Sequence, residues 1–108
     1  MNKKVVTSDP SLPFSEIVIS NGLAYVSGQV SIDPDAKLIE GDIETQTKVT
    51  LENLKAVLAK AGLGMESVVR TGCYLVNRED LAGFNKVYSQ FFSAEKPARS
   101  TIIISSLP

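Results

Sequence analysis

Two short apolar runs near the N-terminus are separated by a turn signal. Ile17-Val18-Ile19-Ser20 and Leu23-Ala24-Tyr25-Val26 are rich in β-prone residues, and Asn21-Gly22 lies between them. Asn-Gly suits a two-residue hairpin because both turn residues need a positive φ. We therefore predict an antiparallel hairpin whose second strand continues to about Val30, followed by a turn at Asp33-Pro34-Asp35.

A helical period replaces the strand pattern after this turn. Apolar or small residues recur at intervals of three and four, at Ile43, Thr47, Leu51, Leu54, Leu58 and Ala61. This spacing predicts one amphipathic helix from about Asp42 to Ala61. Asp42 is placed as its N-cap, and Gly62 lies where a left-handed residue ends a helix.

The remaining pattern predicts a strand over Val68–Val76, a helix over Asp80–Phe92 and a strand over Ala98–Ser105. Strand-helix-strand units cross over right-handed and join parallel strands, so the chain should form a mixed sheet with both helices on one face, an α+β fold. Ile102-Ile103-Ile104 places apolar groups on both sides of the last strand, as in a doubly buried strand. We infer that neighbouring subunits cover the other sheet face; the alternative is a monomer that exposes a large apolar patch.

Composition narrows the classes of function. The 108 residues make one domain, and the net charge of -1 gives no footprint for nucleic acid or an anionic membrane. No apolar run approaches the roughly 20 residues of a membrane span, and polar residues from Thr7 to Ser11 interrupt any signal-peptide core, so we expect a cytoplasmic protein. There is no histidine and one cysteine, Cys73, which excludes histidine-based nucleophile pairs and an intrachain disulfide. We find no phosphate-binding loop, dinucleotide pattern or metal-ligand cluster, and expect no metal or cofactor.

Arg99 is the most informative polar residue. Strand alternation places it on one face with Thr101 and Ile103, where a planar two-pronged donor suits a carboxylate. From the residues alone, a surface salt bridge is the favoured alternative. Gly28 marks either a simple bulge or a close approach to the backbone, and Asn85 lies at the edge of the second helix's apolar stripe. We interpret Cys73 as an inert packed thiol.

A set of short segments, weak singly but specific in order and spacing, resembles the Rid (YjgF) family over nearly the whole chain. The segments are Tyr25-Val26-Ser27-Gly28-Gln29, Glu40-Gly41-Asp42-Ile43-Glu44-Thr45-Gln46-Thr47, Leu51-Glu52-Asn53-Leu54-Lys55-Ala56-Val57-Leu58, Ala61-Gly62, Val68-Val69, Phe84-Asn85-Lys86-Val87-Tyr88, Phe91-Phe92, Pro97-Ala98-Arg99-Ser100 and Leu107-Pro108. The resemblance implies a fold like bacillus chorismate mutase and a homotrimer with a central barrel. It also implies ligand sites in the clefts between subunits.

The same resemblance assigns roles to individual residues. Arg99 matches the arginine that clamps the substrate carboxylate, Gly28 a position whose backbone contacts the ligand, and Asn85 a helix asparagine near the cleft. Phe14 stands where active members usually carry a tyrosine, and Thr101 where the family often has a cysteine. Family members also continue past Leu107-Pro108 with a strand bearing a glutamate that positions or activates water, so we expect the natural protein to be longer.

The implied activity is hydrolysis of 2-imino acids to 2-keto acids and ammonia, without a cofactor. Arg99 would hold the carboxylate while a carboxylate base moves protons; Glu16 and Glu40 are the stand-in candidates. The alternative is a non-catalytic trimer that binds small carboxylates, which the Phe14 departure favours. A ribonuclease, a name used for some relatives, is disfavoured by the acidic balance and the lack of histidine.

Overall fold

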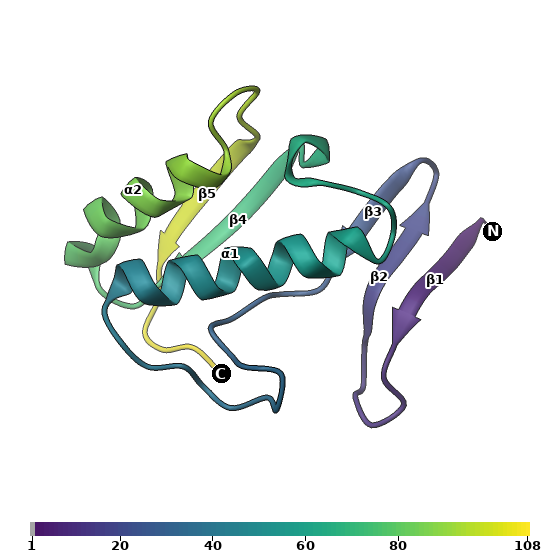
Figure 1. Cartoon of the computed structure of the whole chain (residues 1–108), viewed down its shortest axis with the longest axis horizontal. Helices are drawn as coiled ribbons and strands as arrows, with labels where there is room; N and C mark the ends of the chain where they lie inside the picture. Colours follow the sequence, from purple (N-terminus) through teal and green to yellow (C-terminus); the bar gives the residue numbers. More distant parts are fainter. Residues whose placement is uncertain (1) are drawn as a thin grey trace.

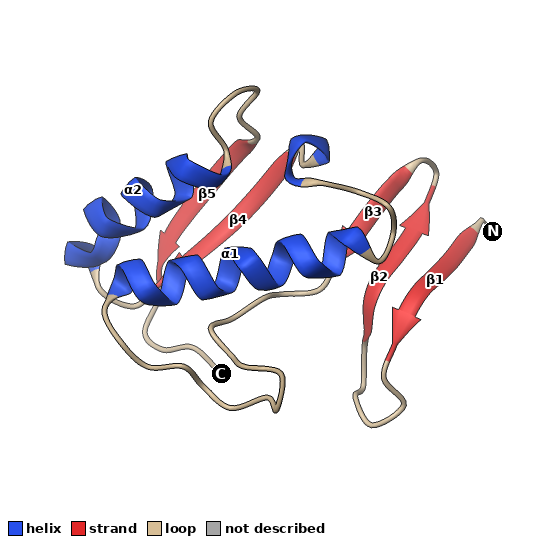
Figure 2. Cartoon of the chain, viewed as in Figure 1, coloured by secondary structure: helices blue, strands red, loops and turns tan. Residues whose placement is uncertain are grey.

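The computed structural model describes residues 2–108 and contains five strands and two α-helices. The strands are β1 (Lys3–Ser8), β2 (Ser15–Ser20), β3 (Leu23–Val26), β4 (Arg70–Leu75) and β5 (Ala98–Ile103), and the helices are α1 (Ile43–Ala59) and α2 (Leu81–Phe91). Both helices lie on one side of the strands (Figures 1 and 2). The α+β class and the helices on one face are confirmed.

The N-terminal hairpin forms as predicted. Asn21 and Gly22 have φ values of 52° and 77°, which the two-residue turn requires. The second strand ends at Val26, however, and does not continue to Val30. Beyond it the chain turns towards α1, where the Asn53 side-chain amide donates to the carbonyl oxygens of Val30 and Ile32 in place of a neighbouring strand.

The strand β1 was not predicted. It pairs antiparallel with β2, with irregular register between Val5 and Ser8. Its apolar content is only Val5-Val6 after two lysines, too little for the sequence pattern to mark it.

The strands of the described chain form two sheets, which corrects the expectation of one continuous mixed sheet. One sheet has the order β1-β2-β3, and the other pairs β4 with β5 in parallel. The parallel pair joined through α2 is as predicted, whereas no backbone ladder joins β3 to β4. Helix α1 lies across both sheets and links them by packing (Figure 1).

The helix termini follow their local signals. The Asp42 carboxylate accepts a hydrogen bond from the Thr45 backbone N–H at 2.8 Å, as an N-cap does. Gly62 has a φ of 72° just beyond the end of α1.

The core lies between the helices and the β4–β5 sheet. Leu51, Tyr88 and Phe92 are buried together, with Met65, Cys73, Phe84 and Phe91 among the partly buried residues around them. In the other sheet, Ile17 of the middle strand β2 is fully buried. None of the helices in residues 2–108 is long and apolar enough to cross a membrane.

Ile102 and Ile103 remain 48% and 39% exposed in the single chain. The strand β5 is therefore not doubly buried within the single chain.

Candidate functional site

Arg99 lies over two aromatic rings of α2. Its guanidinium carbon is 4.8 Å from the centroid of the Tyr88 ring and 5.5 Å from that of Phe84. The two rings are four residues apart and so stand on one face of α2. A guanidinium over an aromatic face is attracted by the ring's quadrupole, which here fixes the direction of the Arg99 side chain.

The Arg99 guanidinium makes no hydrogen bond or ion pair with any side chain of residues 2–108. The two ion pairs in this part of the chain join Lys60 to Glu16 and Lys86 to Glu44. The surface salt bridge that the residue type alone favoured is therefore wrong for Arg99. Its side chain is exposed, and its donors are available to an anion from outside the chain.

A polar cluster supports the Tyr88 ring from the sheet. Arg99 pairs across the ladder with Thr71, and the Thr71 hydroxyl is 2.7 Å from the Tyr88 hydroxyl. The Cys73 thiol donates to the same Thr71 oxygen at 3.8 Å. Burial raises the pKa of the Cys73 thiol, against smaller lowering effects of Thr71 and Arg99. The thiol stays protonated at neutral pH, in agreement with the interpretation of Cys73 as inert.

Thr101 and Asn85 lie on the elements that carry this cluster. Thr101 pairs with Cys73 across the β4–β5 ladder and is half-buried. Asn85 follows Phe84 on α2, and its side-chain carbonyl oxygen is buried without a donor among the described residues. A buried amide oxygen without a partner is costly, so Asn85 has acceptor capacity for a group beyond this part of the chain.

Phe14 and Gly28 lie in the segments that flank the β2–β3 hairpin, just before β2 and two residues after β3. Phe14 is 51% exposed and lines a hollow of about 440 Å³ with Val18, Tyr25 and Ser27, on the β1–β2–β3 sheet. Gly28 is exposed, and a Cβ at its position would meet no atom within 4 Å. Within one chain, Arg99 and Thr101 lie on β5 and Asn85 on α2, the two elements that the Arg99–Tyr88 contact joins, whereas Phe14 and Gly28 lie beside the β2–β3 hairpin.

The two stand-in carboxylates are not part of the Arg99 cluster. Glu16 of β2 accepts from the Lys60 ammonium at 2.9 Å and from the Thr7 hydroxyl at 3.1 Å. The Lys60 hydrogen bond is the main cause that lowers the pKa of Glu16, so this carboxylate is a poor proton acceptor. Glu40 is exposed in the loop before α1.

Sequence reasoning missed the support of Arg99. The sequence patterns assign no functional role to Tyr88, Phe84 or Thr71. The available signal was their spacing of four on α2 together with the position of Arg99 on the strand that follows α2. Residues 2–108 contain no group of three metal-ligating side chains.

The sequence matches the family described as Endoribonuclease L-PSP over residues 6–108. The chain belongs to this family, which includes the Rid proteins. It is 38% identical over 113 residues to a RutC family protein of Pyrococcus abyssi, covering 100% of this chain and 89% of the relative. It is 40% identical over 97 residues to a candidate regulator, AldR, of Lactococcus lactis, covering 89% and 77%.

Solved structures of Rid proteins have the same fold. The conserved Rid family protein YyfA of Yersinia pestis superposes with a TM-score of 0.90 at 38% identity, covering 98% of this chain and 89% of YyfA. TdcF of E. coli, solved with bound serine, superposes with a TM-score of 0.84 at 29% identity, covering 97% and 85%. The Rid fold expected from the sequence segments is confirmed.

Proposed function

We propose that this Rid protein hydrolyses 2-imino acids to 2-keto acids and ammonia, with Arg99 as the carboxylate anchor. The observation that carries the proposal is the unpaired, exposed Arg99 guanidinium held over the Tyr88 and Phe84 rings. A guanidinium fixed in direction loses little freedom when it takes up a carboxylate with two parallel hydrogen bonds. TdcF, solved with bound serine, supports a small α-carboxylate as the ligand class.

The chemistry requires little beyond positioning. A 2-imino acid already carries an electrophilic C=N carbon, so water adds to it, and the resulting carbinolamine expels ammonia to leave the 2-keto acid. Arg99 would fix the carboxylate next to that carbon, and Thr101 on β5 and Asn85 on α2 are the further polar side chains that we assign to the ligand. No metal or cofactor is required for this sequence of steps.

We further propose that the site is completed between subunits of a homotrimer. Apolar side chains are exposed on both sheets, among them Tyr25 at 60%, Tyr74 at 55% and Ile102 at 48%. Strand alternation and the ladder pairing put Tyr74 and Ile102 on the sheet face opposite Arg99. Packing of these faces against neighbouring copies would remove them from water and could bring Phe14 and Gly28 of one subunit to Arg99 of the next.

A test of this subunit arrangement uses two variants with complementary defects. Arg99→Ala removes the anchor, and Gly28→Phe fills the space beside the exposed Gly28 backbone. If the two positions belong to one cleft from different subunits, mixed trimers regain intact clefts and activity. Activity that stays at the level of the separate variants would place both residues in one subunit. A monomer mass by light scattering at micromolar concentration would reject the trimer.

The alternative function is binding of small carboxylates without turnover. Two observations favour it: Phe14 has no hydroxyl to donate, and Glu16 is engaged by Lys60, away from Arg99. A general base typically contributes about 10²–10⁴ in rate, so a chain without one near Arg99 would bind substrate better than it turns it over.

The decisive experiment measures hydrolysis of a freshly generated imine of a 2-amino acid, with the uncatalysed rate subtracted. The deaminase proposal predicts a rate above background that Arg99→Ala removes. Arg99→Lys should retain only part of it, because a point charge does not reproduce the two-pronged donor. A background rate in the wild type, together with 2-ketobutyrate binding that depends on Arg99, would favour the binding protein. The loss of both would reject Arg99 as the anchor.

We also propose, from the family resemblance, that the base in an active form of the protein is a glutamate outside these 108 residues. Comparison of the 108-residue chain with a version extended by any natural continuation tests it. A higher rate in the extended protein at equal 2-ketobutyrate affinity would assign the base to the added residues, and equal rates would show that such a base is dispensable.

A further inference from the structure

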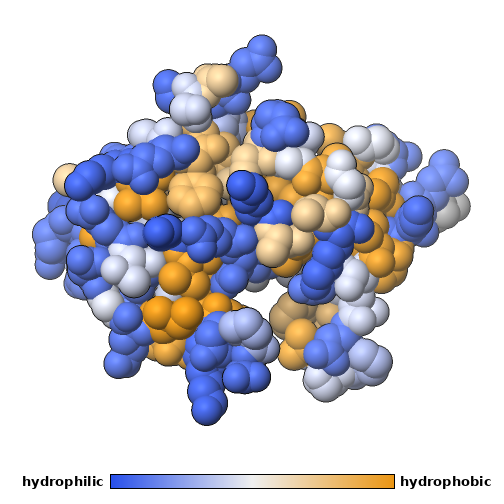
Figure 3. Space-filling model, viewed as in Figure 1, coloured by the Kyte–Doolittle hydropathy of each residue, from blue (hydrophilic) through white to orange (hydrophobic). Residues whose placement is uncertain are grey.

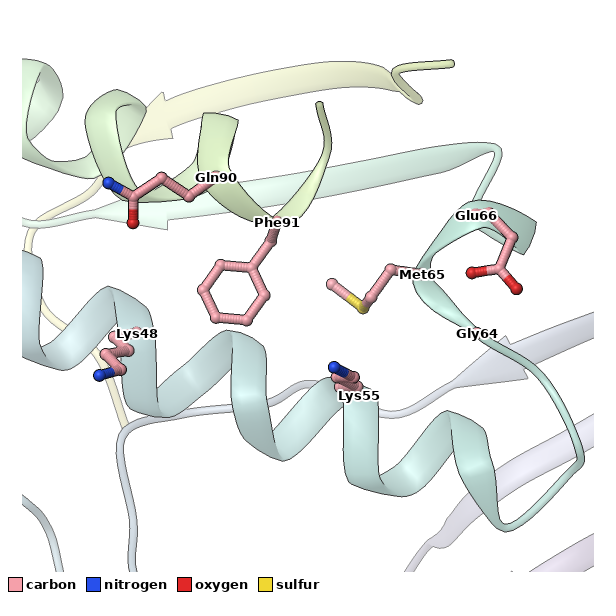
Figure 4. Close-up of a pocket in the computed structure, with 7 residues that line it drawn as sticks. All are labelled: Lys48, Lys55, Gly64, Met65, Glu66, Gln90 and Phe91. Atoms are coloured by element: carbon pink, nitrogen blue, oxygen red, sulfur yellow. The ribbon is translucent and has the colours of Figure 1, made fainter. Parts of the chain in front are cut away.

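The outer side of the helix layer carries a hollow that the Arg99 site does not use. It has a volume of about 510 Å³ and lies between the middle of α1, the end of α2 and the short turn at Met65–Ser67. Figure 4 shows Lys48 and Lys55 on α1, Gln90 and Phe91 on α2, and Met65 and Glu66 on the turn. The size is within the range of small-molecule sites.

The floor of this hollow is apolar, and hydrophobic surface is visible between the two helices in the space-filling view (Figure 3). Met65 extends towards the Phe91 ring in Figure 4, and both residues are partly buried against the core cluster of Leu51, Tyr88 and Phe92. A polarizable thioether beside an aromatic ring is a favourable surface for a flat or branched apolar group.

The rim is cationic on the α1 side. Lys48 and Lys55 are seven residues apart, so they stand on the same face of α1 with their Cα atoms about 10 Å apart. Neither forms an ion pair within residues 2–108, whereas Lys60 and Lys86 do. Glu66 is the one acidic side chain of the lining, which leaves the rim with a net charge of +1 in a chain of net charge -1.

We infer that this hollow, defined by Lys48, Lys55, Met65 and Phe91, binds a small hydrophobic carboxylate with its apolar group on Met65 and Phe91 and its carboxylate at the lysines. The apolar floor favours a ligand with a hydrophobic group, and the lysines at the rim favour a ligand that carries a negative charge. Glu66 disfavours multiply charged anions such as phosphate by like-charge repulsion. The hollow is separate from the Arg99 site, because neither Arg99 nor the Phe84 and Tyr88 rings beneath it line the hollow.

The test uses methionine methyl groups as reporters. The chain has two methionines, Met1 and Met65, so ¹³C-methyl labelling gives two signals that Met65→Leu assigns. Titration with 4-phenylbutyrate should shift the Met65 methyl signal saturably. The neutral 4-phenylbutyramide and the ring-free butyrate should both bind more weakly.

Single variants distinguish binding in the hollow from binding elsewhere on the protein. Lys48→Gln and Lys55→Gln should each weaken 4-phenylbutyrate binding about two- to fivefold, as the loss of an exposed ion pair does. Lys37→Gln, an equal charge change on a loop lysine outside the hollow, should leave it unchanged. Arg99→Ala should also leave the Met65 shift intact.

The inference is overturned if the Met65 signal does not respond at millimolar 4-phenylbutyrate, or if the lysine variants and the amide bind as the wild type and acid do. A Met65 shift that disappears in Arg99→Ala would overturn it as well, because the ligand would then act from the Arg99 site. Imine hydrolysis is not used as a readout, so the failure of the proposed function would leave this result unaffected.

Discussion

The contact between the Tyr88 and Thr71 hydroxyls gives a sharp test of how the Arg99 support is built. Tyr88 is only 7% exposed, and its hydroxyl lies 2.7 Å from that of half-buried Thr71. A net hydrogen bond stabilises by about 1 kcal/mol, and a buried group left without a partner adds to the loss. Tyr88→Phe and Thr71→Val should therefore each lower the free energy of unfolding by about 1–2 kcal/mol.

The double variant distinguishes a true contact from two unrelated losses. If the hydroxyls stabilise one another, Tyr88→Phe with Thr71→Val costs less than the two single changes together, by about 1 kcal/mol. Urea unfolding at one fixed protein concentration measures this, since assembly would make stability concentration-dependent. Tyr25→Phe, on a 60% exposed tyrosine, is the matched control and should change little. Additive losses in the double variant would refute the contact.

The Tyr88→Phe variant also tests whether the Tyr88 ring contributes to ligand binding at Arg99. Tyr88→Phe keeps the ring under Arg99, so the affinity for 2-ketobutyrate should stay within about twofold, whereas Tyr88→Leu removes the cation–π contact and should weaken binding. Equal binding by both variants would mean that the ring does not orient Arg99.

Two further predictions concern the packing around the site. Glu16→Gln should lower the free energy of unfolding by less than about 1 kcal/mol, because the ion pair between Glu16 and Lys60 is partly exposed. The pKa of Glu16 in the folded state lies below its ordinary 4.5, so the stabilisation is present above about pH 4.5 and is lost as the pH falls through the folded-state value. Urea unfolding of the wild type and the variant across pH 3–7 would measure this loss. Gly83→Ala should lower the free energy of unfolding by about 1 kcal/mol although alanine favours helices more than glycine, because the new Cβ would lie 2.6 Å from the Cγ2 of Ile43. In an Ile43→Ala background the same change should stabilise the protein, and a gain in stability in the wild-type background would contradict the argument.

The elements read correctly from sequence are those specified by nearby residues. Asn21-Gly22 specifies its own turn, and Asp42 with Gly62 marks the ends of α1 within one or two residues. The strand β1 lacks such a signal and was missed. The relation between β3 and β4 depends on how α1 crosses the layer, which no local pattern encodes, and the expected continuous sheet was not found.

In the candidate site, too, the features that nearby residues specify were predicted, and those that depend on contacts between distant segments were not. Alternation along β5 predicted that Arg99 and Thr101 share a face, and the ladder agrees. The rings under Arg99 come from α2, so their role became visible only with the packing of α2 on the sheet. Phe14 and Gly28 flank the β2–β3 hairpin, and their proposed meeting with Arg99 requires a second copy of the chain.

Arg99 by itself does not separate a deaminase from a carboxylate-binding protein, because both functions need the same anchor. A deaminase differs from a binding protein in having a proton acceptor near the water molecule that attacks the imine carbon. Glu16 is held by Lys60, and the Cys73 thiol stays protonated because burial raises its pKa. Neither can act as an efficient base beside Arg99 in the described chain. The proposed catalysis therefore requires a base that the described chain does not place beside Arg99, whereas the proposed binding requires only Arg99 and its aromatic support. Substrate affinity should accordingly be more robust than turnover to any change outside the Arg99 cluster.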